Sequence, residues 1–205
     1  MEFHQVLARR RMVRNYSEEP VDADALRRIA EASTQAPSAG YSQGQAAVVV
    51  TDPAIRQAIA EAAGEPGYVA MGFDPWVSRA AALIVLCVSE DAYHRRYQMP
   101  DKLRPDGTEI DWPVPFWWVD AGASLMAVLL AAVDEGLAAG FLGVHAFDDL
   151  KGLLAIPEEY AIVGVVTVGH PAPDRRSGSL DLGRRPRSTV IHENRWVPSG
   201  PSSHV

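Results

Sequence analysis

The residues of this sequence best suited to chemistry are arginines near its two ends. Residues 7–16 read LARRRMVRNY, so three consecutive arginines, Arg9 to Arg11, are followed by Arg14. Arg184 and Arg185 lie in LDLGRRPR, where Gly183 and Pro186 indicate a tight backbone path. Guanidinium groups bind phosphate oxygens in a bidentate manner. The pattern indicates a bound anion such as a phosphate monoester.

The spacing of the N-terminal residues also bears on whether the arginines bind an anion. Phe3, Val6, Leu7 and Arg10 follow the i, i+3, i+4, i+7 pattern of one helical face, which predicts a helix over residues 2–11. An arginine that continues an apolar face is costly unless a fixed anion meets it. The alternative is a solvated helix end at Arg9 to Arg11, where positive charge favours the helix dipole, and spacing alone does not decide between the two.

Most other functional classes find no support in the sequence. The net charge is -7, which argues against nucleic acid as a partner. There is no G-x-G-x-x-G motif, P-loop, H-E-x-x-H or G-x-S-x-G, and the six histidines lack ligand spacing, so no metal site is expected. Cys87, the single cysteine, lies in an apolar run and is expected to be a core thiol. No side chain stands out as acid, base or nucleophile.

The sequence also bears on localisation. The N-terminus has no apolar segment before a small-residue cleavage site, so no signal peptide is expected. The longest apolar stretch, residues 119–141, carries Asp120, Asp134 and Glu135 and is interpreted as a buried core helix. We therefore expect a cytoplasmic protein without membrane association.

Hydrophobic periodicity and turn residues predict helices flanking a few strands, an α+β sheet sandwich. Asp22 is the expected N-cap of a helix that Pro37 ends, and Pro53 is expected in the first turn of another helix. The predicted helices cover residues 22–36, 53–64, 116–137 and roughly 147–156, the predicted strands 46–52, 81–89 and 160–171, with a short element at 140–144 and extended chain at 189–191.

Residues 90–115 are polar, proline-bearing and aromatic, with no sustained period. A long irregular segment in a compact domain is usually a functional loop or a disordered one, and its aromatic residues favour the first. Residues 197–205 are expected to be a flexible tail.

Five segments in order make the sequence similar to the nitroreductase family of FMN-dependent oxidoreductases. They are RRRMVRNYSEEPV, APSAGYSQGQ, DAGASLMAVLLAAVDEGLAAGFLGV, VGVVTVGHPAPD and RRPRSTVIHENRW. The resemblance spans residues 3–196 and implies a three-layer sandwich, with a central, mostly antiparallel sheet between helices and a C-terminal extension. It implies one FMN-binding domain over residues 1–196, with residues 90–118 as a variable, lid-like loop.

The resemblance also implies which residues hold the FMN. The phosphate would be held by Arg10, Arg11, Arg14, Arg184 and Arg185; Met12 replaces a usual serine, which leaves only its backbone. Pro37, Ser38, Ala39, Tyr41 and Gln43 match a segment at the flavin edge, where Tyr41 stands in place of a common asparagine. Leu142 and Gly143 match the segment whose backbone amides approach flavin N5 and O4, although Gly143 could equally be a strand-end turn.

The activity implied is hydride transfer from NAD(P)H through the flavin to a nitroaromatic, quinone or similar acceptor by a ping-pong mechanism, with no catalytic side chain required. Family members are homodimers with two FMN sites at the subunit interface, and the helix of residues 116–137 fits such an interface. Trp112, Phe116 and Trp117 are hypothesised to form an aromatic lid with Tyr41, although they could simply pack on the core. The alternatives are a flavin-sequestering or flavin-fragmenting protein, a reductive dehalogenase, or a deazaflavin cofactor.

Overall fold

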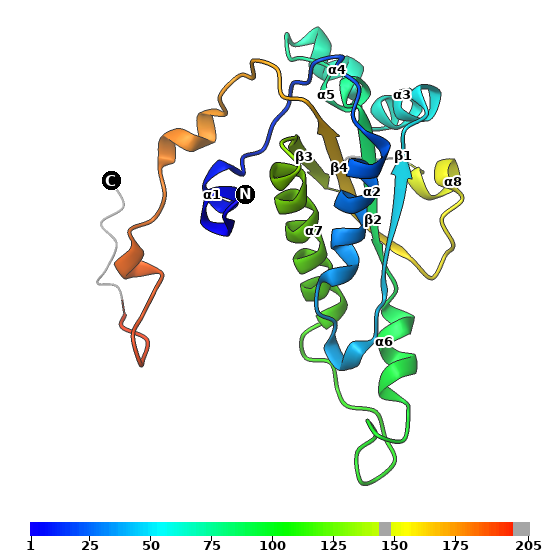
Figure 1. Ribbon diagram of the computed structural model, residues 1–205. Helices are drawn as coiled ribbons and strands as arrows, with labels where there is room; N and C mark the ends of the chain where they lie inside the picture. The colour runs from blue at the N-terminus through cyan, green and yellow to red at the C-terminus, as the bar shows by residue number, and fades with distance from the viewer. Residues whose placement is uncertain (144–148, 199–205) are drawn as a thin grey trace. The chain divides into compact units, whose positions relative to one another are not determined.

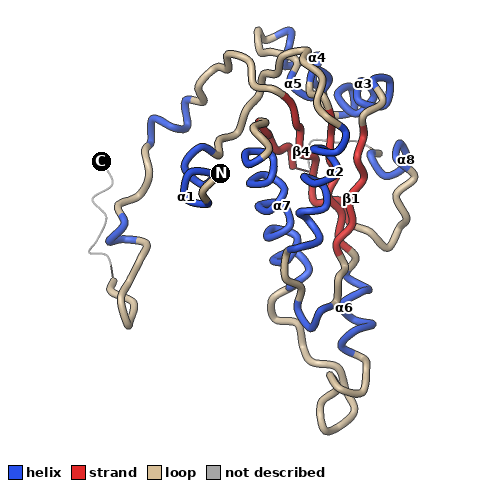
Figure 2. The backbone as a smooth tube through the Cα atoms, in the orientation of Figure 1, coloured by secondary structure: helices blue, strands red, loops and turns tan. Residues whose placement is uncertain are grey.

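The protein is built around a four-stranded antiparallel sheet with helices on both faces (Figures 1 and 2). The computed structural model describes residues 1–143 and 149–198. The strand order is β1-β2-β4-β3, with every neighbouring pair antiparallel. The α+β class and the antiparallel central sheet predicted from the sequence are confirmed. The strands are β1 (Gln45–Val50), β2 (Ala82–Val88), β3 (Ala138–Gly143) and β4 (Ala161–Gly169).

Strand β2 lies at the centre of the fold and is buried along its whole length. Because side chains alternate along a strand, Ala82, Ile84 and Leu86 face one helical layer, whereas Leu83, Val85 and Cys87 face the other. The expected core position of Cys87 is thereby confirmed. Burial raises the pKa of its thiol to about 11, so the thiol stays protonated at neutral pH.

The helices form the two outer layers. On one face α2 and α7 pack against the sheet, and on the other α3, α5 and α8 do so. The helices are α1 (Phe3–Arg9), α2 (Ala23–Glu31), α3 (Pro53–Ala62), α4 (Glu65–Ala70), α5 (Trp76–Arg79), α6 (Glu90–Tyr97), α7 (Phe116–Asp134) and α8 (Leu150–Leu154), with short 3-10 turns η1 (Ala32–Gln35) and η2 (Ala39–Tyr41).

Local capping explains where several helices begin. The Asp22 carboxylate accepts a hydrogen bond from the Ala25 N–H at the start of α2, which confirms the predicted N-cap. Pro53 opens α3 as predicted. The first predicted helix ends earlier than expected, at Arg9, because Arg10 turns to extended backbone and the chain runs on toward β3.

Helix α6 contradicts the prediction that residues 90–115 are irregular throughout. The Ser89 hydroxyl caps the Ala92 N–H, Glu90 and Asp91 lie in the first turn, and Arg96 lies in the last. Only Tyr93 of this helix is buried, so the segment has no apolar period for a pattern search to detect. The extended chain predicted at residues 189–191 is also wrong, because Arg187–Thr189 form a 3-10 turn closed by Thr189 N–H to Pro186 O.

The chain divides into two compact units, Met1–Asp174 and Arg175–Val205. The first contains the sheet and all the helices above. The second carries two 3-10 turns, Gly178–Leu182 and Arg187–Thr189. Most of the tail predicted to be flexible, as well as Val144 and His145, lies outside the described residues.

Helix α7 is the one described helix whose length and apolarity would suffice to cross a membrane, with a mean hydropathy of 1.7 over an 18-residue window. Its buried face packs against the sheet and against η1, where the Ser124 hydroxyl donates to the Ser33 carbonyl oxygen at 2.9 Å. These contacts are those of a core helix, as the sequence predicted.

Candidate functional site

The N-terminal segment after α1 docks on the outer edge of β3. The Val13 N–H donates to the Ala139 carbonyl oxygen at 3.0 Å, and Met12 pairs with Ala139 in a parallel bridge. Gly140 permits this approach, because a Cβ there would lie 2.5 Å from the Val13 carbonyl oxygen. Two of the segments assigned to FMN by resemblance, residues 10–14 and 140–143, therefore lie side by side.

Tyr16 fixes the end of the docked segment. Its buried hydroxyl donates to the Val13 carbonyl oxygen at 3.0 Å and lies 2.7 Å from Thr167 Oγ1. Burial raises the pKa of Tyr16 well above its usual value, so the hydroxyl remains a donor. The path of the basic segment is thus held by the core.

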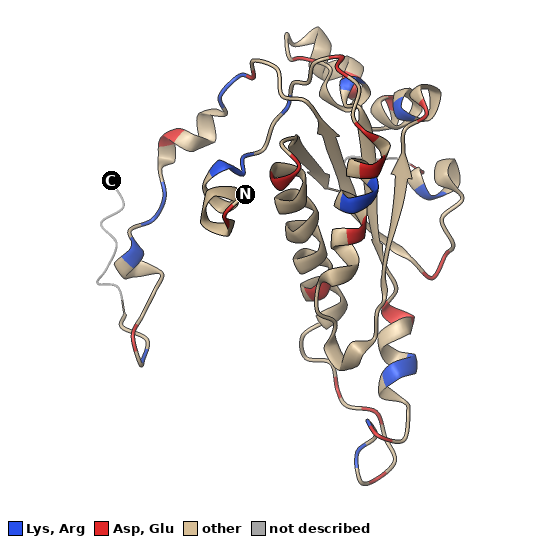
Figure 3. Ribbon diagram, in the orientation of Figure 1, with Lys and Arg blue, Asp and Glu red and all other residues tan. Residues whose placement is uncertain are grey.

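The arginines of this segment differ from others in the first unit. Arg28, Arg96 and Arg104 each form an ion pair with a carboxylate. The guanidinium groups of Arg10, Arg11 and Arg14, in contrast, have no hydrogen bond or ion pair with any described residue, and Figure 3 shows their basic stretch directly after α1. A set of unpaired guanidinium groups on a fixed backbone suits a phosphate, so these residues fit the anionic end of FMN.

Arg14 is held in place without a carboxylate on its side chain. Its guanidinium carbon lies over the Trp76 ring, 5.7 Å from the centroid, and its backbone N–H donates to Asp174 at 2.8 Å. The neighbouring Asn15 accepts from Arg79 at 3.0 Å and donates to the Pro173 carbonyl oxygen. The donors of Arg14 thereby remain available for an anion.

The other end of β3 offers backbone donors. Ala139 uses its outward edge to pair with Val13, and strand geometry directs the backbone groups of Phe141 and Gly143 to that same edge. No described strand pairs with that edge beyond β3. The Gly143 N–H is thus positioned to reach a ligand, while the backbone groups of Leu142 face β4.

The segment Pro37–Gln43 lies elsewhere, at the start of β1. Ser38 accepts at Oγ from the Gln43 N–H at 3.0 Å, and Ala39 donates its N–H to the Asp120 carboxylate at 2.8 Å. Tyr41 is 76% exposed and has a positive φ of 62°. Asp120 is buried on α7 and also accepts from the Tyr93 hydroxyl at 2.8 Å. The turn is thus anchored in the core and presents the Tyr41 ring outward.

Within one chain this turn and the basic segment are far apart. They flank β1 and β3, the two edge strands, at opposite ends of the sheet. Helix α7 contacts Ala39 through Asp120 near its start and the amino group of Met1 through Asp134 at its end. Fourteen residues of helix separate those contacts by about 20 Å.

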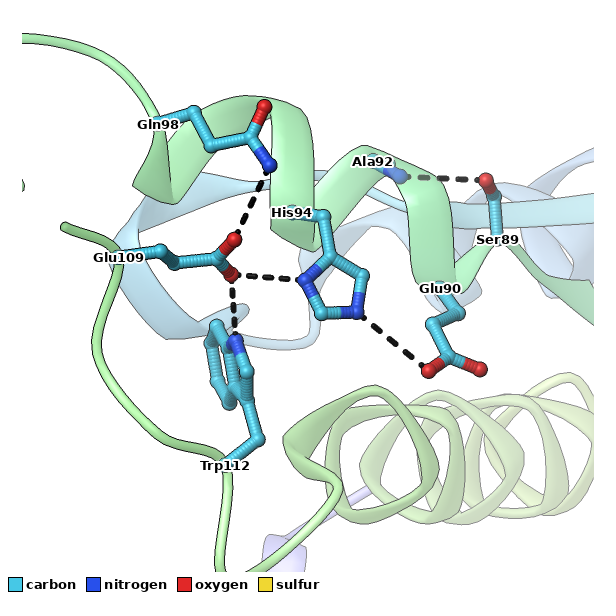
Figure 4. A network of polar contacts seen from close by, with 7 residues as sticks. All are labelled: Ser89, Glu90, Ala92, His94, Gln98, Glu109 and Trp112. Atoms are coloured by element: carbon cyan, nitrogen blue, oxygen red, sulfur yellow. Dashed lines mark hydrogen bonds and ion pairs between the residues drawn. The ribbon is translucent and has the colours of Figure 1, made fainter.

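Three of the residues predicted to form a lid, Trp112, Phe116 and Trp117, gather beside α6. Figure 4 shows Trp112 in this place. Trp117 is buried against Tyr93, and Trp112 packs edge-on against Tyr97 with ring centroids 4.6 Å apart. Phe116 remains exposed at the start of α7. Of the three, Phe116 is the most exposed, at 42%.

A carboxylate fastens the loop that carries Trp112. Glu109 accepts from Trp112 Nε1 at 2.6 Å and from Gln98 at 3.1 Å, and its carboxylate lies 2.7 Å from His94 Nδ1 (Figure 4). Glu90 approaches His94 Nε2 at 3.4 Å. Partial burial opposes protonation of His94, but the hydrogen bonds with Glu109 and Glu90 outweigh it and raise the pKa of His94.

Arg184 and Arg185 belong to the second unit, where Arg185 donates to the Thr189 carbonyl oxygen at 3.1 Å. The described residues contain no group of three or more histidine, cysteine, aspartate or glutamate side chains that could hold a metal ion.

Sequence reasoning missed Trp76, Asp120 and Arg96 as residues that hold the candidate segments. The available signal was an acid inside an apolar helix, Asp120, and it was used only to argue against a membrane span.

Comparison with known proteins gives a consistent result. Residues 7–170 match the model of the nitroreductase family. A putative NADH dehydrogenase/NAD(P)H nitroreductase of Archaeoglobus fulgidus is 27% identical over 191 residues, which cover 91% of this chain and 94% of that protein. An NADPH-flavin oxidoreductase of Vibrio harveyi is 27% identical over 188 residues, covering 91% and 71%. An FMN reductase [NAD(P)H] of Bacillus subtilis is 27% identical over 206 residues, covering 95% and 75%.

Solved structures show the same fold. Nitroreductase A from Vibrio parahaemolyticus superposes with a TM-score of 0.72 at 26% identity, over 97% of this chain and 77% of that one. A hypothetical oxidoreductase from Bacillus subtilis superposes with a TM-score of 0.74 at 25% identity, over 97% and 76%.

Proposed function

Because this chain belongs to the nitroreductase family and is an FMN-dependent NAD(P)H oxidoreductase, we propose that it passes hydride from NAD(P)H through FMN to a nitroaromatic, quinone or similar acceptor by a ping-pong mechanism. Bound FMN supplies the redox chemistry. The residues of the chain bind it, orient it and stabilise negative charge on it.

The observation that carries this proposal is the docking of the basic segment on β3. It sets the unpaired guanidinium groups of Arg10, Arg11 and Arg14 beside the strand that presents the Gly143 N–H. Arginines suit the phosphate, and backbone donors suit a ring that gains negative charge. Arg184 and Arg185 are proposed as further phosphate ligands.

We propose a homodimer as the working form. The turn at Pro37–Gln43 and the basic segment lie at opposite corners of one chain, so a partner subunit is needed to bring copies of both to one FMN. Val119, Gly122 and Met126 follow one face of α7 and are exposed, and the charged residues of α7 are confined to Asp120 and Asp134 (Figure 3). This apolar face suits burial in an interface, and in such a dimer residues 1–196 would act as one FMN-binding domain in the cytoplasm.

The acceptor side is proposed to include Tyr41 and Phe116, the exposed members of the predicted lid. Trp112 and Trp117 would support them, since both pack on Tyr93 of α6. An aromatic surface suits a planar acceptor.

The test is the visible spectrum of the purified protein under anaerobic conditions. Flavin bands that bleach with NADPH or NADH and return with a nitroaromatic or a quinone are the expected result. Bands that both nicotinamides leave unchanged would favour a flavin-sequestering protein. Protein that stays colourless after incubation with FMN would contradict the proposed site.

A further inference from the structure

Arg96 connects two segments that are far apart in sequence. Its Nε donates to the Gly40 carbonyl oxygen at 2.8 Å, within the turn that carries Tyr41. Its two terminal nitrogens donate to the two carboxylate oxygens of Asp101, at 2.8 and 2.7 Å. One guanidinium group thus joins helix α6, the turn and the start of the loop of residues 98–115.

A close steric contact lies beside these hydrogen bonds. A Cβ on Gly40 would lie 2.6 Å from a ring carbon of Tyr97, so only glycine allows the turn to sit this close to α6. The Tyr97 ring in turn packs on Trp112 of the loop. The turn and the loop therefore share α6 as a common support.

The turn has a backbone that needs such support. Gly40 and Tyr41 have φ values of 61° and 62°, and Gln43 has 51°. The left-handed region is unfavourable for residues with a Cβ and persists where surrounding contacts enforce it. Asp120 holds the start of the turn through the Ala39 N–H, and Arg96 holds its middle through the Gly40 carbonyl.

We infer that Arg96 is a positioning residue, which orients Tyr41 toward the electron acceptor and lets the loop of residues 98–115 tune that orientation through Asp101. The inference rests on the proposed function for the presence of the acceptor beside Tyr41. The geometric part, that Arg96 enforces the turn, stands independently of it. The bidentate contact makes the effect specific to arginine.

The experiment measures amide hydrogen exchange in the turn and steady-state kinetics with 1,4-benzoquinone, for the wild type and Arg96→Gln. The Tyr41 and Ser42 amides, which donate to the Ser38 and Ala39 carbonyl oxygens, are expected to exchange about tenfold faster in the variant, because a hydrogen bond from a charged donor is lost. KM for benzoquinone is expected to rise about three- to tenfold, with kcat changed less than about twofold. Arg96→Lys keeps the positive charge but loses the paired N–H donors of the guanidinium group. Its exchange rates and its KM should lie between those of the wild type and Arg96→Gln.

Arg104 provides the matched control. It pairs with Asp111 in the same loop at 2.6 Å and does not contact the turn. Arg104→Gln should leave exchange and KM as in the wild type, and Asp101→Asn, a change at an exposed carboxylate, should give a smaller version of the Arg96→Gln effect.

Exchange in the turn that stays unchanged in both Arg96→Gln and Asp101→Asn would overturn the inference, as would equal effects of Arg104→Gln. Faster exchange with an unchanged KM would overturn the role in acceptor orientation. Wild-type protein that binds no FMN would instead refute the proposed function, and the exchange result would still decide whether Arg96 holds the turn.

Discussion

Val13 and Ala139 are 126 positions apart, yet the Val13 N–H donates to the Ala139 carbonyl oxygen at 3.0 Å and places the basic segment on β3. Gly140→Ala should separate them, since the new Cβ would meet the Val13 carbonyl oxygen at 2.5 Å and the Trp76 ring at 2.8 Å. We expect a loss of about 1–3 kcal/mol in the free energy of unfolding together with weaker FMN binding. Urea denaturation and FMN titration measure the two.

Gly67→Ala is the matched control for that change, because a Cβ on Gly67 meets nothing within 4 Å. It lies in helix α4, where alanine is favoured, and should leave FMN binding unchanged. Equal loss of FMN affinity in both variants would refute the specific role of Gly140.

Arg14→Gln should discriminate between FMN and riboflavin. If the unpaired guanidinium binds the phosphate, FMN affinity should fall about tenfold while riboflavin affinity stays the same. Flavin fluorescence quenching measures both. Arg27→Gln is the comparison, since Arg27 is exposed and already paired with Asp24. A parallel loss of riboflavin affinity would place Arg14 away from the phosphate.

Asp120→Ala should be strongly destabilising. The change leaves the Ala39 N–H and the Tyr93 hydroxyl without their acceptor in a buried site, at a cost of about 2–5 kcal/mol. Burial first, and then the hydrogen bond with Asp120, raises the pKa of Tyr93, which keeps its hydroxyl a donor. Tyr93→Phe should lower the free energy of unfolding by less than Asp120→Ala does, because only one donor is removed and the hydrogen bond from Ala39 to Asp120 remains. Similar stabilities for wild type and Asp120→Ala in urea would contradict this account.

The network around His94 should make the stability of the loop depend on pH. The pKa of His94 is raised above its usual 6.5, so the protonated form is favoured in the folded state. That stabilisation is fully present below about pH 6.5 and is lost as the pH rises through the raised pKa. Glu90 of α6 and Glu109 of the loop face the ring, while Trp112 and Trp117 contact it without charge.

Limited proteolysis of the loop at several pH values tests this, with cleavage between residues 98 and 115 expected to accelerate on the alkaline side. In His94→Gln the stability of the loop should no longer vary in that window. A wild-type profile that matches the variant, after correction for the protease's own pH dependence, would be evidence against this role of His94.

Val119→Arg should interfere with dimer formation. Val119 lies on the exposed apolar face of α7, and a charge there would be desolvated in an interface. Sedimentation is expected to show a shift toward monomer, with weaker FMN binding because each site would lose the partner's turn. Leu153→Arg, at an exposed leucine of α8, is the control. Val119→Arg protein that stays dimeric and retains FMN would exclude this face as the interface.

Local signals made much of the fold predictable. The β-branched run of β2, the Asp22 cap and Pro53 each depend on neighbouring residues, and each was confirmed. Helix α6 was missed because its stability comes from the Ser89 cap and a single buried ring, Tyr93, rather than from an apolar period. The 3-10 turn at Arg187–Thr189 was missed because β-branched residues suggested extended chain.

The candidate site depends on contacts between distant positions. The arginines and the turn were identified from the sequence, but the pairing of Val13 with Ala139 and the bond from Arg96 to Gly40 have no local signature. Trp76 reads as an ordinary apolar residue until the structure places Arg14 over its ring. Sequence patterns could thus suggest which segments matter, and they could not show which residues hold them.

Helix α7 fixes both the distance and the rotation between the residues near its two ends. One inserted residue would lengthen it by about 1.5 Å and turn everything beyond by about 100°. Asp120 could then face Ala39 only if Val128 and Ala132 left the sheet. The connection between α6 and α7 is fixed at Asp101 and Glu109, so a residue inserted between these two anchors would leave the phase of α7 unchanged, whereas a residue inserted in the helix would not.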